Sequence, residues 1–197
     1  IEGYTANDGF GVSAAMSDNY AIVGAYGAKK AFIFARNAST DTWGTTAVAT
    51  LAGCVSCANF GLSVSITDNY AIVGARSGNQ AFIYARDASS GAWGTTAVAP
   101  LTSYMAESGF GVSVAMTDNY AIVGAHTAGG DAGKAFIFGR DGSTWDTTAK
   151  VTITSSISGS QFGRGVAITD SYAIVGAYIA CKAFIYARDA SGTWSTT

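Results

Sequence analysis

An aspartate and an arginine recur together four times along the chain, and they are the first candidates for a functional site. A charge pair that occurs once in every repeat is more naturally a structural tie than a catalytic group. If such a pair is exposed, it contributes only about 0–1 kcal/mol to stability. We therefore predict that these residues are structural ties. The pairs are Asp18 with Arg36, Asp68 with Arg86, Asp118 with Arg140, and Asp170 with Arg188.

Histidine and serine offer another route to catalysis. His126 is the single histidine of the chain and lies in a Gly-rich segment. A Ser-His-Asp triad requires one particular serine beside the histidine, and nothing distinguishes one serine from the many others. We interpret His126 as a surface residue, predict no catalytic residue and expect that the protein is not an enzyme.

The three cysteines could bind a metal or form a disulfide. Cys54 and Cys57 form a Cys-x-x-Cys sequence, and Cys181 lies far from them. A zinc site would need a second pair of ligands, which is missing. In an extracellular protein we expect a local Cys54–Cys57 disulfide, with Cys181 unpaired or linked to another chain. Three free thiols or a different pairing are the alternatives.

Asn37 begins the one N-glycosylation sequon of the chain, Asn37-Ala38-Ser39. Such an acceptor belongs in a surface loop of a secreted protein. Its predicted position in a turn agrees with a eukaryotic secretory protein, so we expect Asn37 to be a possible glycosylation site.

The composition excludes several partners and cofactors. The net charge is −2 and no basic block occurs, so a nucleic-acid partner has no electrostatic support. Polar residues or glycine interrupt every apolar run before it could cross a membrane as a helix, so we predict no membrane insertion. The glycine motifs do not follow the strand-to-helix pattern of a phosphate-binding loop, and we predict no cofactor.

The chain is a fourfold internal repeat. Each repeat has Phe-Gly, then Tyr-Ala-Ile-Val-Gly-Ala, then Ala-Phe-Ile followed by Phe or Tyr, and then a lone Trp. We interpret residues 1–197 as a single repeat domain. Its repeats are approximately 1–50, 51–100, 101–152 and 153–197.

Each repeat is predicted to form four short strands. Residues 60–67 alternate apolar and small polar side chains, as a half-buried strand does. Asp68-Asn69 then forms a two-residue turn, because both residues tolerate the positive φ of a type I′ hairpin. Residues 70–75 and 81–86 supply two further strands, and residues 97–99 supply the fourth.

This pattern predicts an all-β fold, a β-propeller of four-stranded antiparallel blades. A β-solenoid is the alternative, but its coils usually lack tight hairpins. The four repeats would form either a four-bladed ring or part of a larger, for example seven-bladed, propeller. The recurring Phe and Trp are expected to pack between blades, and the recurring Gly to permit close approach of their backbones. Thr197 aligns with Thr46 and Thr96, so we expect the last repeat to lack its fourth strand.

These motifs resemble the FG-GAP repeat, in register in all four copies. The final Pro of Gly-Ala-Pro is replaced here by Tyr26, Arg76, His126 and Tyr178. The resemblance implies a β-propeller, commonly seven-bladed, of the kind found on extracellular and cell-surface proteins, including the integrin α head. In that family the propeller mediates adhesion and protein–protein contact.

Calcium-binding members of the family carry a D-x-D-x-D-G loop in the hairpin between the first two strands. Calcium requires six to eight oxygen ligands, several of them carboxylates. In this chain each hairpin has a single carboxylate, as in Thr67-Asp68-Asn69. We therefore predict no metal in these hairpins.

The resemblance leads to a first hypothesis of a non-enzymatic extracellular module for adhesion or protein interaction. A second hypothesis is a structural subunit of a filament or surface layer that assembles through sheet edges. The low charge and the incomplete last blade favour this second hypothesis. A glycan-binding lectin is a third. The expected partners are therefore another protein, copies of the same chain or, in the third case, glycans.

Overall fold

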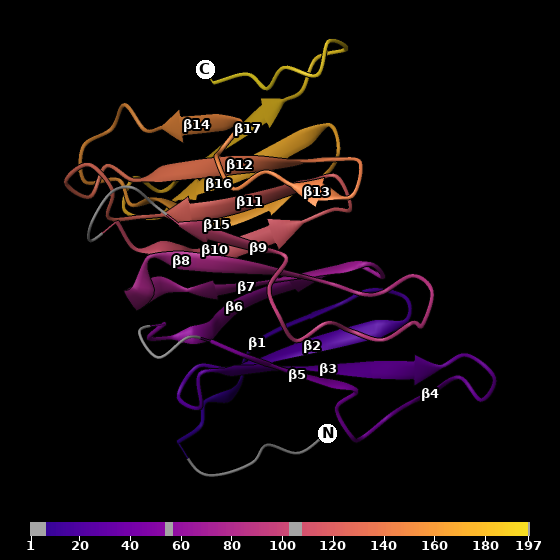
Figure 1. The fold of residues 1–197 in the computed structure, drawn as a ribbon. Helices are drawn as coiled ribbons and strands as arrows, with labels where there is room; N and C mark the ends of the chain where they lie inside the picture. The colour runs from indigo at the N-terminus through magenta and orange to yellow at the C-terminus, as the bar shows by residue number, and fades with distance from the viewer. Residues whose placement is uncertain (1–6, 54–56, 103–107, 197) are drawn as a thin grey trace.

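A computed structural model describes residues 7–53, 57–102 and 108–196 and shows an all-β chain of four antiparallel sheets (Figure 1). Each sheet corresponds to one sequence repeat, and we call it a blade. The predicted all-β fold with four-stranded antiparallel blades is confirmed. Among the described residues, none belongs to a helix long and apolar enough to cross a membrane.

The first and third blades have the same set of strands. In each, a two-residue strand that contains the Trp pairs with one end of the third strand, and the strand that follows pairs with the rest of it, so the sheet has five strands. The first blade contains β1 (Phe10–Met16), β2 (Tyr20–Ala25), β3 (Lys30–Asn37), β4 (Thr42–Trp43) and β5 (Ala49–Ala52). The third contains β10 (Phe110–Met116), β11 (Tyr120–Ala125), β12 (Lys134–Asp141), β13 (Thr144–Trp145) and β14 (Val151–Thr154).

In the second and fourth blades the Trp forms an isolated bridge to the recurring Arg instead of a short strand. The second blade contains β6 (Phe60–Ile66), β7 (Tyr70–Ala75), the 3₁₀ turn η1 (Arg76–Gly78), β8 (Gln80–Ala85) and β9 (Ala99–Thr102). The fourth contains β15 (Phe162–Ile168), β16 (Tyr172–Ala177) and β17 (Lys182–Ala187), so its described residues form three strands.

The fourth strand lies two residues later than the sequence suggests. It was expected at residues 97–99 in the second repeat, whereas β9 spans Ala99–Thr102. The reason is the alternation of burial in β9, where Ala99 and Leu101 are fully buried and their neighbours are exposed. Leu101 therefore belongs to the last strand of the second blade and not to the first residues of the third repeat.

The hairpin after the first strand forms as predicted, but without type I′ geometry. Neither Asp68 nor Asn69 has a positive φ. Instead the hydroxyl of Thr67 accepts a hydrogen bond from the Tyr70 main-chain N–H at 3.0 Å, and the Thr67 N–H donates to the Tyr70 carbonyl at 2.8 Å. The threonine side chain therefore closes the turn, which removes the need for a left-handed backbone.

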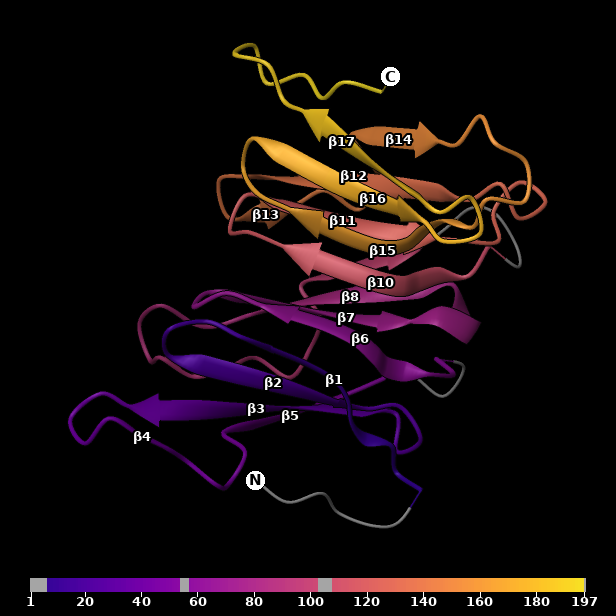
Figure 2. The same ribbon diagram turned by 180° about the vertical axis from the view of Figure 1, so that it is seen from behind.

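The blades stack face to face along the chain, and three apolar clusters of the described residues each lie between two successive blades, whereas a fourth lies within the first blade (Figures 1 and 2). One cluster joins Ile22 and Ile33 of the first blade to Phe60 and Trp93 of the second. Equivalent clusters join the second blade to the third and the third to the fourth. The first and fourth blades lie at opposite ends of this stack, so the described residues form an open array and not a closed four-bladed ring.

Two glycines from neighbouring blades meet at each junction, as the close approach of backbones requires. Gly61, in Phe-Gly, has φ +90° at the point where the β6–β7 register shifts, which marks a bulge. A Cβ atom on Gly24, in Val-Gly-Ala, would lie 2.0 Å from the carbonyl oxygen of Gly61. The same contact joins Gly74 to Gly111, and Gly124 to Gly163.

We predict that Gly74→Ala destabilises the protein, because the new methyl group would lie 2.2 Å from the Gly111 carbonyl oxygen of the next blade. Forced overpacking of this kind typically costs about 1–3 kcal/mol. Urea unfolding followed by tryptophan fluorescence measures the loss.

Gly176→Ala is the matched control, because it stands at the same position of the fourth blade. There the nearest atom to a Cβ is the Gly165 carbonyl oxygen, at an ordinary contact distance of 3.5 Å. The control should change the free energy of unfolding by less than about 0.5 kcal/mol. Equal losses for the two variants would contradict the close approach of blades as the cause.

Candidate functional site

The carboxylate of each recurring Asp joins its blade to the preceding one. Asp68 Oδ1 accepts a hydrogen bond from Ser17 Oγ at 2.5 Å, and Oδ2 accepts one from Asn19 Nδ2 at 2.6 Å. Ser17 and Asn19 belong to the hairpin of the first blade, whereas Asp68 belongs to that of the second. We call this arrangement the carboxylate clamp. Asp118 repeats it with Thr67 and Asn69, and Asp170 repeats it with Thr117 and Asn119.

The clamp favours the ionised carboxylate. Partial burial of Asp68 opposes ionisation, but the hydrogen bonds from Ser17 and Asn19 and the positive charge of Arg86 outweigh it. The pKa of Asp68 therefore lies below its usual value. An ionised acceptor makes shorter and stronger hydrogen bonds than a neutral one, so the clamp holds two hairpins in register.

The recurring Arg does approach the recurring Asp, but not its carboxylate. Arg86 Nε donates to the main-chain carbonyl of Asp68 at 2.8 Å. The guanidinium lies over the ring of Tyr20 in the preceding blade, 5.6 Å from its centroid. The same carbonyl contact is made from Arg36 to Asp18, from Arg140 to Asp118, and from Arg188 to Asp170.

This geometry corrects the expected charge pairs. In the first blade Tyr20 pairs with Ala35, and the next residue, Arg36, donates its main-chain N–H to the carbonyl of Asn19. This register directs the Arg side chain to the main chain of its own hairpin, and the carboxylates of Asp68, Asp118 and Asp170 bond the preceding blade instead. In the first blade, Arg36 forms its ion pair with Asp41 instead, at 2.6 Å.

In the first three blades, the Tyr that begins the second strand is covered by the Trp of the next blade. Tyr20 and Trp93 meet edge to face, with ring centroids 5.3 Å apart, and Tyr70 meets Trp145 in the same way at 5.4 Å. Tyr120 and Trp194 form the third such pair. The Nε1 atoms of these three Trp residues are buried without a hydrogen-bond acceptor among the described residues, so the rings contribute apolar contact here.

A serine in the first strand of each of the first three blades completes the junction. Ser13 Oγ donates to the carbonyl of Gly61 at 3.0 Å, and Ser63 Oγ donates to that of Gly111 at 2.9 Å. Ser113 makes the same bond to Gly163. Sequence reasoning missed these serines and the hairpin Ser or Thr. Their recurrence at one position of the repeat was the available signal.

These contacts define two faces for every blade. The trailing face carries the Ser, the hairpin Thr and Asn, the Tyr and two Ile residues. The leading face carries the Phe-Gly, the Asp carboxylate, the Arg and the Trp, and it packs on the trailing face of the preceding blade. The recurring polar and aromatic residues therefore bind the blades to one another.

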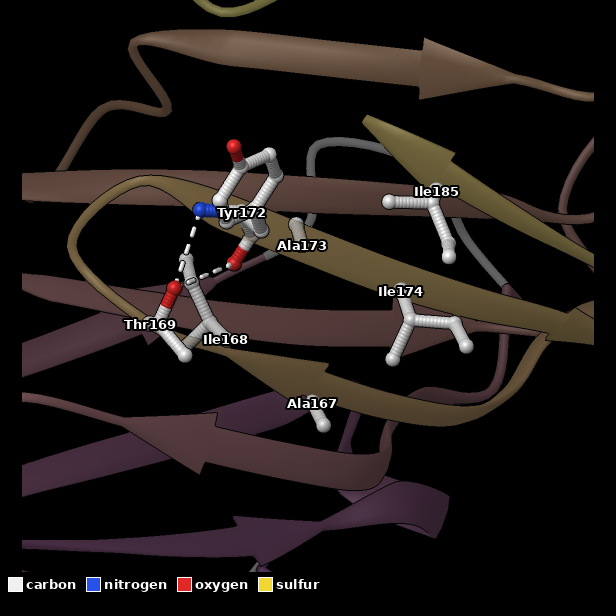
Figure 3. A pocket seen from close by; sticks show the side chains of 7 residues that line it. All are labelled: Ala167, Ile168, Thr169, Tyr172, Ala173, Ile174 and Ile185. Atoms are coloured by element: carbon white, nitrogen blue, oxygen red, sulfur yellow. Dashed lines mark hydrogen bonds between the residues drawn. The ribbon is translucent and has the colours of Figure 1, made fainter. Parts of the chain in front are cut away.

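No other described strand covers the trailing face of the fourth blade. Ala167, Ile174 and Ile185 pair across β15, β16 and β17 and form an apolar row beside Tyr172, as Figure 3 shows. Ile174 is 39% exposed and Ile185 is 69% exposed. At the same two positions the first three blades have Ile residues with no exposed surface, namely Ile22, Ile33, Ile72, Ile83, Ile122 and Ile137.

His126 is buried, which corrects its interpretation as a surface residue. Only 2% of it is exposed, and Gly109 packs directly on the imidazole ring. Burial disfavours the charged imidazolium and is the main reason that the pKa of His126 lies below its usual value; the positive charges of Arg76 and Arg164 lower the pKa further. The ring is therefore neutral at neutral pH.

The cysteines and the sequon fall in different parts of the molecule. Cys57 is buried and takes part in a disulfide bond, whereas its expected partner Cys54 lies outside the described residues. Cys181 is free and exposed. Asn37 is exposed at the end of β3, where its Oδ1 accepts a hydrogen bond from the Ser39 N–H at 2.9 Å.

Within the described ranges, His, Cys, Asp and Glu do not gather in any group of three that could hold a metal ion. Each blade has one hairpin aspartate, and three of these aspartates form carboxylate clamps.

The strand order and the face-to-face stacking define a repeat protein of the β-propeller class. The family model of the FG-GAP repeat matches residues 3–39 and 102–138, which lie in the first and third repeats. The chain is therefore an FG-GAP-type repeat protein. A search of curated proteins found no match. FG-GAP repeats are typical of extracellular proteins.

We predict that Asp68→Asn lowers the free energy of unfolding by about 1–2 kcal/mol, because it removes a charged hydrogen-bond acceptor between blades. Asp18→Asn is the matched control. Asp18 occupies the same hairpin position in the first blade, and it is exposed to solvent. Urea unfolding should show a change of less than about 0.5 kcal/mol for the control. A control as destabilised as Asp68→Asn would rule out the clamp as the source.

The clamp also predicts a pH dependence. Because the pKa of Asp68 is lower in the folded protein than in the unfolded chain, the ionised group stabilises the fold above the unfolded pKa of about 3.9. That contribution disappears as the pH falls through the folded value. The stability difference between the wild type and Asp68→Asn should therefore be largest near neutral pH and should shrink below about pH 4. Unfolding curves measured across this range would contradict the clamp if the difference stayed constant.

Proposed function

We propose that the chain is a non-enzymatic protein-interaction module that acts outside the cell or at the cell surface. The observation that carries the proposal is the uncovered trailing face of the fourth blade. The other trailing faces show what such a face does in this molecule, because each of them binds a protein surface through the same Ile and Tyr positions.

The exposed part of this face is apolar and continuous. Tyr172, Ile174 and Ile185 are 58%, 39% and 69% exposed, and Ala167 extends the row across a third strand. Large apolar side chains exposed together on a protein surface mark interaction sites, whereas single exposed ones are ordinary. Burial of this row against a partner would contribute favourable hydrophobic free energy at about 25 cal/mol per Å².

The contacts that the recurring residues make support a binding role over a catalytic one. In the second, third and fourth blades the recurring Asp carboxylate and Arg guanidinium contact the preceding blade. In the first three blades the recurring serine hydroxyl contacts the next blade. The single His is buried and neutral. The most reactive recurring groups therefore already have structural partners.

Three features support an extracellular location. FG-GAP repeats are typical of extracellular proteins. Cys57 is disulfide-bonded, and disulfides persist in oxidising compartments. The sequon residue Asn37 is exposed, where a glycosyl transferase could reach it.

Binding to a panel of purified secreted and cell-surface proteins, measured by biolayer interferometry, tests the proposal. We expect at least one specific partner, and we expect the double variant Ile174→Asp with Ile185→Asp to weaken that binding by roughly tenfold or more, since about 1.4 kcal/mol corresponds to a factor of ten. Val48→Asp with Val98→Asp is the control, because both residues are comparably exposed apolar side chains outside this face. Binding that is equally weakened by the control, or that is absent across the panel, would count against the face as an interaction site.

A further inference from the structure

The two ends of the stack are complementary surfaces of one kind of junction. At one end, the fourth blade exposes a trailing face whose counterparts in the other blades are covered. At the other end, the first blade exposes a leading face. Met16 is 65% exposed, whereas Ile66 and Met116 at the same position are buried. A Cβ on Gly11 would meet no atom within 4 Å, whereas Gly61, Gly111 and Gly163 each touch the preceding blade.

The first blade carries the residues that a leading face uses. Asp18 is exposed and supplies the clamp carboxylate, Gly11 supplies the bulge with φ +89°, and Trp43 is partly exposed at the position that covers a Tyr. The fourth blade carries matching residues. Tyr172 is exposed to receive a Trp, and Thr169 stands at the position of the hydroxyl donor in the clamp.

We propose that the trailing face of the fourth blade binds the leading face of the first blade of a second copy of this chain. This proposal rests on the proposed function and names the partner of the same face. A second copy is favoured over an unrelated protein because residues 1–197 carry, on the first and fourth blades, both halves of a junction that occurs three times between their own blades. The contact joins two different surfaces, so it is heterologous. It produces a ring if the rotation closes and an extended array if it does not.

The contact uses blade faces, where the sequence suggested sheet edges. The edge strand of a blade offers main-chain groups, whereas the face offers the apolar row and the Tyr that receive the next blade in all three internal junctions. Copies would therefore continue the stack along its own axis.

Two substitutions make this junction weaker than those inside the chain. Gly165 replaces the Ser that donates to the Phe-Gly carbonyl in the first three blades, and Ser171 replaces the Asn of the clamp. The junction between copies therefore lacks two hydrogen bonds that the internal junctions have. We expect reversible, concentration-dependent association.

Sedimentation velocity on the purified chain tests the proposal. We expect the wild-type protein to sediment increasingly faster as its concentration rises. The trailing-face variant Ile174→Asp with Ile185→Asp and the leading-face variant Met16→Asp should each associate at least roughly tenfold more weakly. The control Val48→Asp with Val98→Asp should behave as the wild type does. A wild-type chain that stays monomeric at all concentrations, or association that the face variants leave intact, would overturn the proposal.

Mixing the two face variants tests the direction of the contact. Each variant retains one intact face, so an equimolar mixture should form a dimer that neither variant forms alone and that does not grow further. A contact between two identical faces would not be restored in this way. Failure of the mixture to dimerise, where the wild type associates, would exclude the heterologous junction.

Disulfide trapping gives a second measurement, which captures association that is too transient to dominate sedimentation. At the junction of the second and third blades, Asn79 Oδ1 lies 3.4 Å from Ser108 Oγ. Cys181 and Asp8 occupy the corresponding positions of the fourth and first blades. Asp8→Cys should therefore form disulfide-linked chains with the native Cys181 under mild oxidation, and Asp8→Cys with Cys181→Ser should not. Cross-linking that persists without Cys181 would contradict the proposed register.

The outcomes separate this proposal from the proposed function. A chain that stays monomeric but binds a different protein through Ile174 and Ile185 would overturn the second copy as the occupant and leave the interaction module standing. A chain that associates with itself but binds nothing in the protein panel would support the self-junction and count against adhesion to other proteins.

Discussion

The close approach of backbones at each blade junction is the constraint on which the rest of the structure depends. Where Gly24 meets Gly61, a single methyl group would lie 2.0 Å from a carbonyl oxygen, so the two sheets are in direct main-chain contact. This approach brings the Ser13 hydroxyl within 3.0 Å of the Gly61 carbonyl. It also places the Ile residues of one blade against the Phe and Trp of the next. The packing, the hydrogen bonds and the register of the hairpins all follow from it.

Each junction combines apolar contacts with hydrogen bonds, and the two make different contributions. The Ile, Phe, Tyr and Trp residues bury apolar area, which is the main favourable term but has little directional preference. The carboxylate clamp and the Ser–Gly hydrogen bond contribute less free energy and more geometric specificity, because each requires defined distances. Together they explain how a chain with only 12% charged residues maintains one register through its stack.

A stack whose blades contact only their neighbours has special ends. In repeat proteins each unit is stabilised by its own sheet and by the junctions on either side, so terminal units have one junction fewer. Terminal units often carry a polar outer face for this reason. In this chain the fourth blade retains Ile174, Ile185 and Tyr172 on its outer face. At the same positions the first three blades bury their Ile residues against the next blade.

Much of the fold follows from the repeat alone. Four recurrences of Phe-Gly, Tyr-Ala-Ile-Val-Gly-Ala and Trp predict four blades, because the alternation of side chains and the tight hairpins are local properties of each segment. The fourth strand was misplaced by two residues because Ala97-Val98-Ala99 and Ala99-Pro100-Leu101 are similarly apolar. Only the contact of Leu101 with the core distinguishes them.

The sequence by itself determined which residues matter, and the tertiary structure decided what each of them contacts. Recurrence identified the Asp, the Arg, the Phe-Gly and the Trp. It could not show that the carboxylate of Asp68 binds Ser17 and Asn19 of another blade, because those residues lie about 50 positions away and the pairing depends on how two sheets stack. In the same way, His126 stands in a Gly-rich loop and is buried by neighbours that only the fold brings together. The uncovered face of the fourth blade is likewise a property of the stack, since its Ile residues are identical in sequence context to those that the other blades bury.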